Sequence, residues 1–194
     1  MKKYIYLFSI FVTQIIYSQI PIRSIGSSNL DDDEVNGAYH KDTNDMLLNF
    51  IGTWEATWES KTITLILEKV TQGLTTNSDN TYYYEDYLIG KFQVKNANGD
   101  VIIPYFVTND VELAKLTSIT YINNFKIGVF YNDVENCNNS ELVILELNAS
   151  NLNSMNYRFQ RYQDFMIMPL DCPYASEDDI PISIPTVPVT FTKL

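Results

Sequence analysis

From Gly52 onward the sequence alternates apolar and polar residues in a series of short runs. Trp54, Ala56 and Trp58 begin the pattern, with threonine and glutamate between them. A period of two places apolar side chains on one face of a β-strand, whereas a helix needs a period near 3.6. No strand-helix-strand alternation follows. The pattern therefore predicts an all-β fold and argues against a parallel α/β sheet.

About nine strands can be placed on this pattern, at the spacing typical of small antiparallel β-proteins. Turn sequences such as Asn98-Gly99 and Asn123-Asn124 favour antiparallel neighbours. Closing the sheet removes exposed strand edges, so we expect an antiparallel up-and-down barrel of about eight to nine strands, with a sandwich as the alternative. A short helical turn, capped by Asn44 or Asp45, should lead into the first strand.

The N-terminus has the layout of a secretory signal peptide: basic Met1-Lys2-Lys3, an apolar run over Tyr4–Tyr17, and Ser18 before Gln19. The apolar run of about 14 residues is shorter than the roughly 20 that span a bilayer as a helix. We therefore expect a signal peptide over 1–18, an extended leader over 19–44 and a single barrel domain over 45–194. The protein should be secreted or periplasmic, without stable membrane insertion.

Charge and residue counts exclude several function classes. Lys and Arg number 13 against 24 Asp and Glu, a net charge of −11, which argues against nucleic-acid binding. The acidic runs Asp31–Glu34 and Glu177–Asp179 lack the spacing of a calcium loop and are interpreted as solvated. His40 is the single histidine, and no nucleophile, phosphate-loop or metal-ligand motif is present. We therefore expect that the protein is not an enzyme and that it binds no metal ion and no cofactor.

Glu55 and Glu59, with Glu68 on the next strand, could be interpreted as the source of the two carboxylates that a glycosidase needs. Nothing raises these side chains above surface charges on the polar face of a strand. The two cysteines, Cys137 and Cys172, form an isolated pair in a chain expected to be exported. Such a pair usually forms a disulfide in an oxidising compartment, and closing this loop would stabilise the fold by roughly 4 kcal/mol.

The stretch Leu48–Trp54 resembles the opening of lipocalin-like barrels, in which a short helical turn leads into Gly-x-Trp at the first strand. Avidin-like and fatty-acid-binding barrels open in a related way. The resemblance implies that Gly52 and Trp54 lie at the closed barrel end, under a basic side chain from a late strand. Arg161 is our candidate for that partner and Arg158 the alternative, with a cation–π contact of about 1 kcal/mol.

The whole chain also resembles an uncharacterised family of secreted Bacteroidota proteins, which share a signal ending in Ser-Gln and a Gly-Thr-Trp opening. This resemblance implies export and brings no known activity.

Two function classes remain open. The first is binding of a small, largely apolar ligand inside the barrel. Its candidate lining residues are aromatic side chains expected to face inward: Trp54, Trp58, Tyr84, Phe92 and Tyr157. Ordinary core packing is the simpler interpretation of the two tryptophans. The second is a protein-interaction or envelope-structural module that uses an outer stripe around Tyr83, Tyr87 and Ile89.

Overall fold

A computed structural model of the chain describes residues 20–26, 36–77, 79–105, 114–137, 139–161, 170–176 and 179–194. The predicted signal peptide, the acidic run 31–34 and residues 177–178 lie outside these residues. Within the described ranges the chain forms one sheet of short and long strands: β1 (Ile22–Ser24), β2 (Tyr39–Lys41), β3 (Gly52–Trp58), β4 (Lys61–Thr76), β5 (Tyr82–Lys95), β6 (Val101–Ile103), β7 (Leu116–Asn123), β8 (Lys126–Asp133), β9 (Asn139–Asn148), β10 (Asn151–Gln160) and β11 (Val189–Lys193).

Eight strands form a closed barrel in which every neighbouring pair is antiparallel. Their order around the barrel follows the chain, β3-β4-β5-β7-β8-β9-β10-β11, and β11 pairs back to β3. β6 lies off this path, against the last residues of β5. The predicted all-β up-and-down barrel is confirmed.

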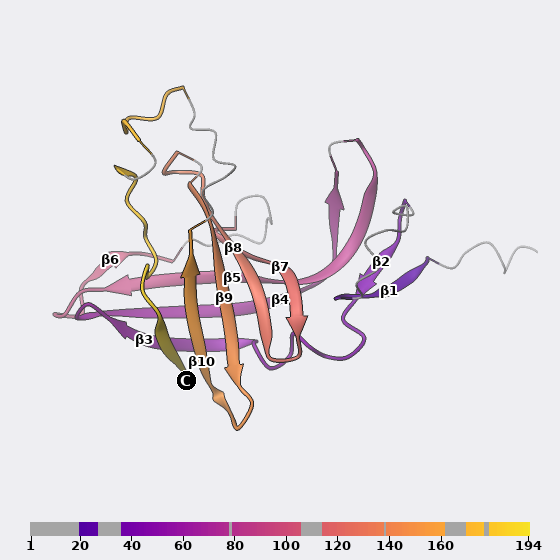
Figure 1. Cartoon of the computed structure of the whole chain (residues 1–194), viewed down its shortest axis with the longest axis horizontal. Coiled ribbons are helices and arrows are strands. Elements are labelled where there is room, and N and C mark those ends of the chain that lie inside the picture. The colour runs from indigo at the N-terminus through magenta and orange to yellow at the C-terminus, as the bar shows by residue number, and fades with distance from the viewer. Residues whose placement is uncertain are drawn as a thin grey trace, which may run out of the picture.

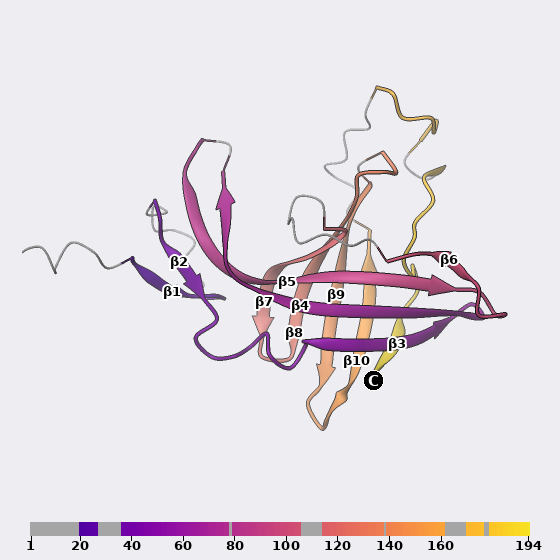
Figure 2. The same ribbon diagram turned by 180° about the vertical axis from the view of Figure 1, so that it is seen from behind.

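The β4–β5 hairpin is longer than the barrel needs. In Figure 1 these two strands run horizontally while β7 to β10 cross them, and Figure 2 shows the crossing from behind. Beyond the barrel the hairpin carries β2, which pairs in parallel with β5, and β1, which pairs with β2. We call this extension, residues 69–76 and 82–87 with β1 and β2, the arm. The described part of the predicted extended leader is thus two strands of the sheet.

A tight turn leads into β3, as predicted, but its cap differs from the prediction. Backbone amides in the turn donate to carbonyl oxygens three residues earlier, for example Phe50 N to Leu47 O at 3.1 Å. The Asp42 carboxylate accepts from the Leu47 amide at 3.2 Å and from the preceding amide at 2.7 Å. Asp42 therefore caps the turn, rather than Asn44 or Asp45, because its carboxylate reaches the first free amides.

The two barrel ends are covered by different segments. At the end where β3 begins, here the Trp54 end, the turn places the fully buried Leu47 and Phe50 against the core. At the opposite end, here the disulfide end, the buried Ile184 comes from the segment before β11. There the Tyr157 hydroxyl donates to the Pro185 carbonyl at 2.7 Å.

The Cys137–Cys172 disulfide joins the turn between β8 and β9 to the segment between β10 and β11. Its Cα atoms are 5.4 Å apart, and the predicted pairing is confirmed. A disulfide of this kind indicates an oxidising compartment.

Candidate functional site

The Gly-x-Trp motif closes the Trp54 end together with a lysine from the last strand. Trp54 is fully buried, and its indole Nε1 donates to the Phe50 carbonyl at 2.8 Å. The Lys193 ammonium lies 5.1 Å from the centre of the Trp54 ring and donates to the Asn49 carbonyl at 3.3 Å. Gly52 has a φ of +133°, and a Cβ there would come within 2.8 Å of Lys193 Cε. Glycine therefore leaves the lysine room to reach the ring.

The basic partner of Trp54 is thus Lys193, and the prediction of Arg161 is wrong. Arg161 follows β10 at the disulfide end, where its Nε lies 3.6 Å from a Glu141 carboxylate oxygen. The alternative, Arg158, is exposed on the outside of β10. The register explains the difference, because β10 starts at the Trp54 end and runs away from it.

Three of the five predicted ligand-lining residues belong to the packed core. Trp54, Phe92 and Tyr157 are each less than 5% exposed. The Phe92 ring lies 6.4 Å from that of Tyr131, and the Tyr157 ring 5.9 Å from that of Phe191, measured between ring centres. These side chains contact one another inside the barrel, so core packing is their role in the described structure.

The other two predicted residues lie elsewhere. Trp58 is half-buried at the far end of β3, with the Lys61 ammonium 4.3 Å from its ring centre. Its buried indole N–H has no hydrogen-bond partner among the described residues. Tyr84 lies on the arm, opposite Tyr39, with its ring edge-on to that of Tyr82 at 6.2 Å. The structure therefore does not bring the five residues around one cavity.

The predicted outer stripe of Tyr83, Tyr87 and Ile89 is also corrected. Tyr87 and Ile89 are 4% and 3% exposed and form a small second core with Ala114. A Cβ at Gly73 would collide with the Tyr87 ring, so the missing side chain on β4 leaves room for this ring against the strand. An alternating pattern could not show that both faces of β5 are covered here.

Two buried carboxylates share one lysine where the arm meets the barrel. The Lys69 ammonium lies 3.0 Å from Asp42 and 3.4 Å from Asp86. Asp86 also accepts from the Tyr39 hydroxyl at 2.6 Å and the Gln72 amide at 3.0 Å. Burial opposes the ionised form of Asp86, yet these hydrogen bonds hold its pKa below the usual value. The cluster joins the N-terminal segment to a bulge in β4, which is a structural role.

A second carboxylate cluster, centred on Asp133, lies beside the disulfide. Asp133 is fully buried and accepts hydrogen bonds, each 2.8 Å long, from the Lys115 ammonium, the Tyr131 hydroxyl and the Asn136 amide. Burial opposes its ionisation, but these donors lower its pKa. The same Lys115 ammonium lies 2.8 Å from Glu135. Burial disfavours the charged lysine, and the two carboxylates nevertheless raise the pKa of Lys115 above its usual value.

Lys115, Asp133 and Glu135 lie next to the line along which β5 pairs with β7 in the barrel wall. We call this line of pairing the seam. Among the described residues, the register partners across the seam are Ile89 with Thr117 and Gly90 with Leu116. A Cβ at Gly90 would lie 2.8 Å from Leu116 Cβ, so glycine permits the close approach of the two strands. Beyond this point β5 continues to its end beside β6 and leaves β7.

A cleft of about 160 Å³ lies where the two strands part. Its apolar lining comes from Phe92, Ile103, Pro104 and Tyr105, with Gly90 at the seam itself. Its charged lining comes from Lys91, Lys115 and Glu135. Phe92 is the one predicted ligand-lining residue in the set. The cleft thus combines an apolar surface with a few charged groups, the composition that small-molecule sites commonly have.

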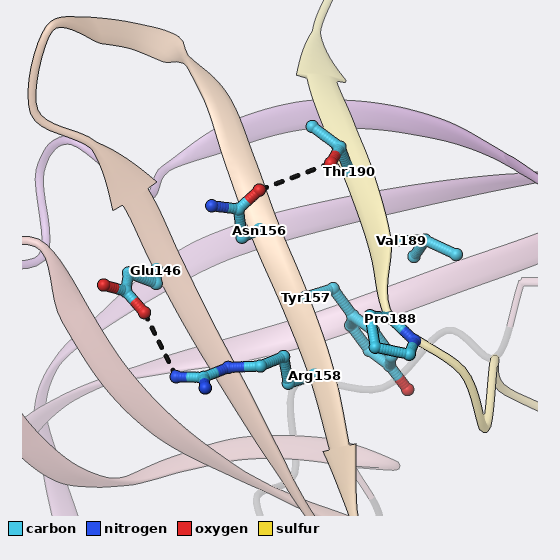
Figure 3. Close-up of a pocket in the computed structure, with 7 residues that line it drawn as sticks. All are labelled: Glu146, Asn156, Tyr157, Arg158, Pro188, Val189 and Thr190. Atoms are coloured by element: carbon cyan, nitrogen blue, oxygen red, sulfur yellow. Dashed lines mark hydrogen bonds and ion pairs between the residues drawn. The ribbon is translucent and has the colours of Figure 1, made fainter.

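A larger and shallower groove of about 380 Å³ lies on the outside of β9, β10 and β11 (Figure 3). Two polar pairs lie across it: Arg158 with Glu146 at 3.2 Å, and Thr190 with Asn156 at 3.3 Å. Pro188 supplies apolar surface at the point where β11 begins. The groove is open and mainly polar, which suits contact with a macromolecule better than enclosure of a small molecule.

The described residues show no arrangement for metal chemistry. No group of three or more His, Cys, Asp or Glu side chains in the described part of the chain is placed to hold a metal ion. In the same residues, no helix has the length and apolar character to cross a membrane.

Sequence reasoning missed the seam cleft and both carboxylate clusters. Their members come from strands far apart in the sequence: Lys115 precedes β7, Ile103 ends β6 and Glu135 follows β8. The one available signal was Gly90 inside a long strand, because a glycine within a strand can mark a close approach of two backbones as well as a bend or bulge.

Comparison with known proteins gives one match. A family model described as a family of unknown function (DUF6705) matches residues 1–194. No curated protein and no solved structure matches the chain. The chain belongs to the DUF6705 family.

Proposed function

We propose that this DUF6705 member is an exported, non-enzymatic binding protein that holds a small molecule in the seam cleft. The observation that carries the proposal is the cleft itself, in which Phe92, Ile103 and Tyr105 form an apolar surface beside Lys91 and Lys115. The proposal keeps the small apolar ligand expected from the sequence and moves it from the barrel interior to the barrel wall.

The volume of the cleft limits the size of the ligand. A cavity of about 150 Å³ accepts one benzene-sized molecule. The seam cleft, at about 160 Å³, is therefore large enough for a single ring or a short branched chain. A lipid or a pigment of several rings would not fit without moving the strands.

The packing of the core favours a ligand site in the barrel wall rather than in the barrel interior. The aromatic side chains expected to line a cavity inside the barrel fill the core, and Trp54, Tyr131 and Phe191 are fully buried there. A ligand inside the barrel would have to displace these close-packed side chains, and each displaced large residue would cost several kcal/mol. A ligand in the seam cleft displaces none of them.

Export is supported by the N-terminal sequence and by the Cys137–Cys172 disulfide, which fits the oxidising periplasm or exterior. The absence of enzymatic activity is proposed from the sequence, which offers one histidine and no nucleophile motif.

Native mass spectrometry tests the proposal. The protein is produced from the full chain in an exporting host, and its folded mass is compared with its denatured mass. We expect a bound compound of single-ring size, or uptake of benzene-sized probes added at millimolar concentration. The Ile103→Arg variant should lose this binding, because it fills the cleft. Ile102→Arg is the matched control, since Ile102 is 47% exposed on the same strand and should bind normally.

Failure of the folded protein to bind any such probe would contradict the proposal. Equal binding by the Ile103→Arg and unmodified proteins would contradict the location.

The outer groove of Figure 3 favours a second candidate function, a protein-interaction module. Arg158, Glu146 and Pro188 would then contact a partner chain. A specific co-purified protein that is lost on Arg158→Glu, but retained with Ile103→Arg, would favour this alternative.

A further inference from the structure

We propose that the ligand of the seam cleft is a small carboxylic acid, and that Glu135 occupies the position of its carboxylate until the ligand replaces it. This inference rests on the proposed function and names the chemical class of the ligand. The apolar part of the acid would lie against Phe92 and Ile103, and its carboxylate would accept hydrogen bonds from Lys115.

Lys115 is held in place before any ligand arrives. Its side chain is 13% exposed, and the fully buried Asp133 fixes its ammonium at 2.8 Å. Asp133 is in turn held by Tyr131 and Asn136. An ammonium has three donors, so Lys115 can bond Asp133 and a second carboxylate together, as it does with Glu135 in the structure. A donor that is already ordered loses little entropy on binding, which favours recognition.

Glu135 differs from Asp133 in being exchangeable. Its side chain is 67% exposed, although its carboxylate lies 2.8 Å from the same ammonium. Exposed ion pairs contribute little, and water can replace either partner. A ligand carboxylate with an apolar body gains contact with the cleft wall as well as the ion pair. Glu135 gives up only the ion pair when it moves to solvent.

Lys91 adds a second positive charge to the lining. Its ammonium lies 2.6 Å from Glu68, on the outside of the barrel wall. The whole chain carries a net charge of −11 and would repel an anion at long range. Salt screens such repulsion beyond about 8 Å at physiological ionic strength. Inside the cleft the ligand carboxylate would take the place of Glu135, so the local charge stays the same when the two exchange.

A pair of probes of equal shape separates charge recognition from apolar binding. We would titrate the full exported protein with benzoate and with benzamide, and measure both dissociation constants by calorimetry or NMR. We expect benzoate to bind about tenfold more tightly, since a charged hydrogen bond replaces a neutral one. Glu135→Gln should tighten benzoate binding about two- to fivefold and leave benzamide unchanged, because it removes an exposed competitor for Lys115.

Glu59→Gln is the matched control, because Glu59 is similarly exposed, at 61%, and contacts Lys61 rather than the cleft. It removes the same charge from the chain and should leave both constants unchanged. Equal affinity for benzoate and benzamide, with no effect of Glu135→Gln, would overturn the carboxylate inference while the proposed binding function stands. If neither probe bound, the proposed function itself would fail, and the inference with it.

Discussion

The barrel wall is continuous between β3 and β4 and interrupted between β5 and β7, and this difference locates the cleft. Between β3 and β4 the ladder runs without a break, from Gly52 opposite Leu67 to Trp58 opposite Lys61. Across the β5–β7 seam, the register partners among the described residues are Ile89 with Thr117 and Gly90 with Leu116. The continuous wall covers a solid core, whereas the interrupted wall opens into a cleft. The ligand site that we propose therefore lies in the wall of the barrel and not in its interior.

The largest effect is expected from the continuous wall. Trp54→Ala removes a fully buried ring together with its hydrogen bond to the Phe50 carbonyl. The free energy of unfolding should fall by about 3–5 kcal/mol, which is typical when a large aromatic is lost from a core. Urea unfolding measures it, with the half-buried Trp58→Ala as the comparison. A loss below that of Trp58→Ala would contradict the assignment of Trp54 to the packed end.

Removal of the disulfide should have a similar or slightly smaller effect at the other end. Replacing Cys137 and Cys172 by serine opens a loop with a sequence separation of 35. The chain-entropy estimate for such a loop is about 4 kcal/mol, and measured losses commonly lie between about 2 and 4 kcal/mol. The double variant and the unmodified protein are compared by thermal and urea unfolding. Equal stability would show that the disulfide end is already held by Ile184 and Pro185.

A substitution at the seam should cost less than the loss of a core aromatic. Gly90→Ala adds a Cβ that would lie 2.8 Å from Leu116 Cβ, so the two strands must separate slightly. We expect a loss of about 1–3 kcal/mol, the usual range for overpacking. Gly128→Ala is the matched control in another barrel strand, since its Cβ would meet Thr120 Cβ at 3.3 Å. If both variants were equally stable, the seam would be looser than the geometry indicates.

The smallest and most gradual effect is the loss of stability in acid. Burial opposes the ionisation of Asp86 and Asp133, yet their hydrogen bonds and lysine partners lower the pKa of each carboxyl in the folded protein, so the unfolded chain binds protons more readily than the folded one. Their contribution to stability is present above the unfolded pKa and is lost progressively from about pH 5 downward, as pH falls through the lower folded pKa. The free energy of unfolding should fall as pH is lowered from about 7 to about 3. The slope of this fall should be smaller in Asp133→Asn than in the unmodified protein. An unchanged slope would contradict an ionised Asp133 beside Lys115.

The period-two pattern was sufficient to predict the eight barrel strands, their closure and the inward position of Trp54, but it gave no sign of β1 and β2. The disulfide followed from composition and compartment alone. Prediction failed where residues distant in sequence meet. Lys193, rather than Arg161, reaches Trp54 because the register of β10 and β11 decides which basic residue is near. Tyr87 is buried because Gly73 on the neighbouring strand lacks a side chain.

The candidate site was predicted only in part, for the same reason. Phe92 was expected to line a ligand site inside the barrel, and in the structure it lines the cleft that faces outward through the seam. The other side chains of the cleft come from β6 and from the segments flanking β7 and β8. No local pattern shows that β5 and β7 pair briefly and then separate, because strand separation depends on the whole barrel.

The most direct test of the account is to locate the ligand with isoleucine methyl signals. The full exported protein, labelled at isoleucine methyl groups, is titrated with benzoate and followed by two-dimensional NMR. We predict that the Ile103 signal moves, while those of Ile63 and Ile127, 2% and 0% exposed in the core, stay in place. Movement of Ile63 and Ile127 with Ile103 unchanged would place the ligand inside the barrel and contradict the account.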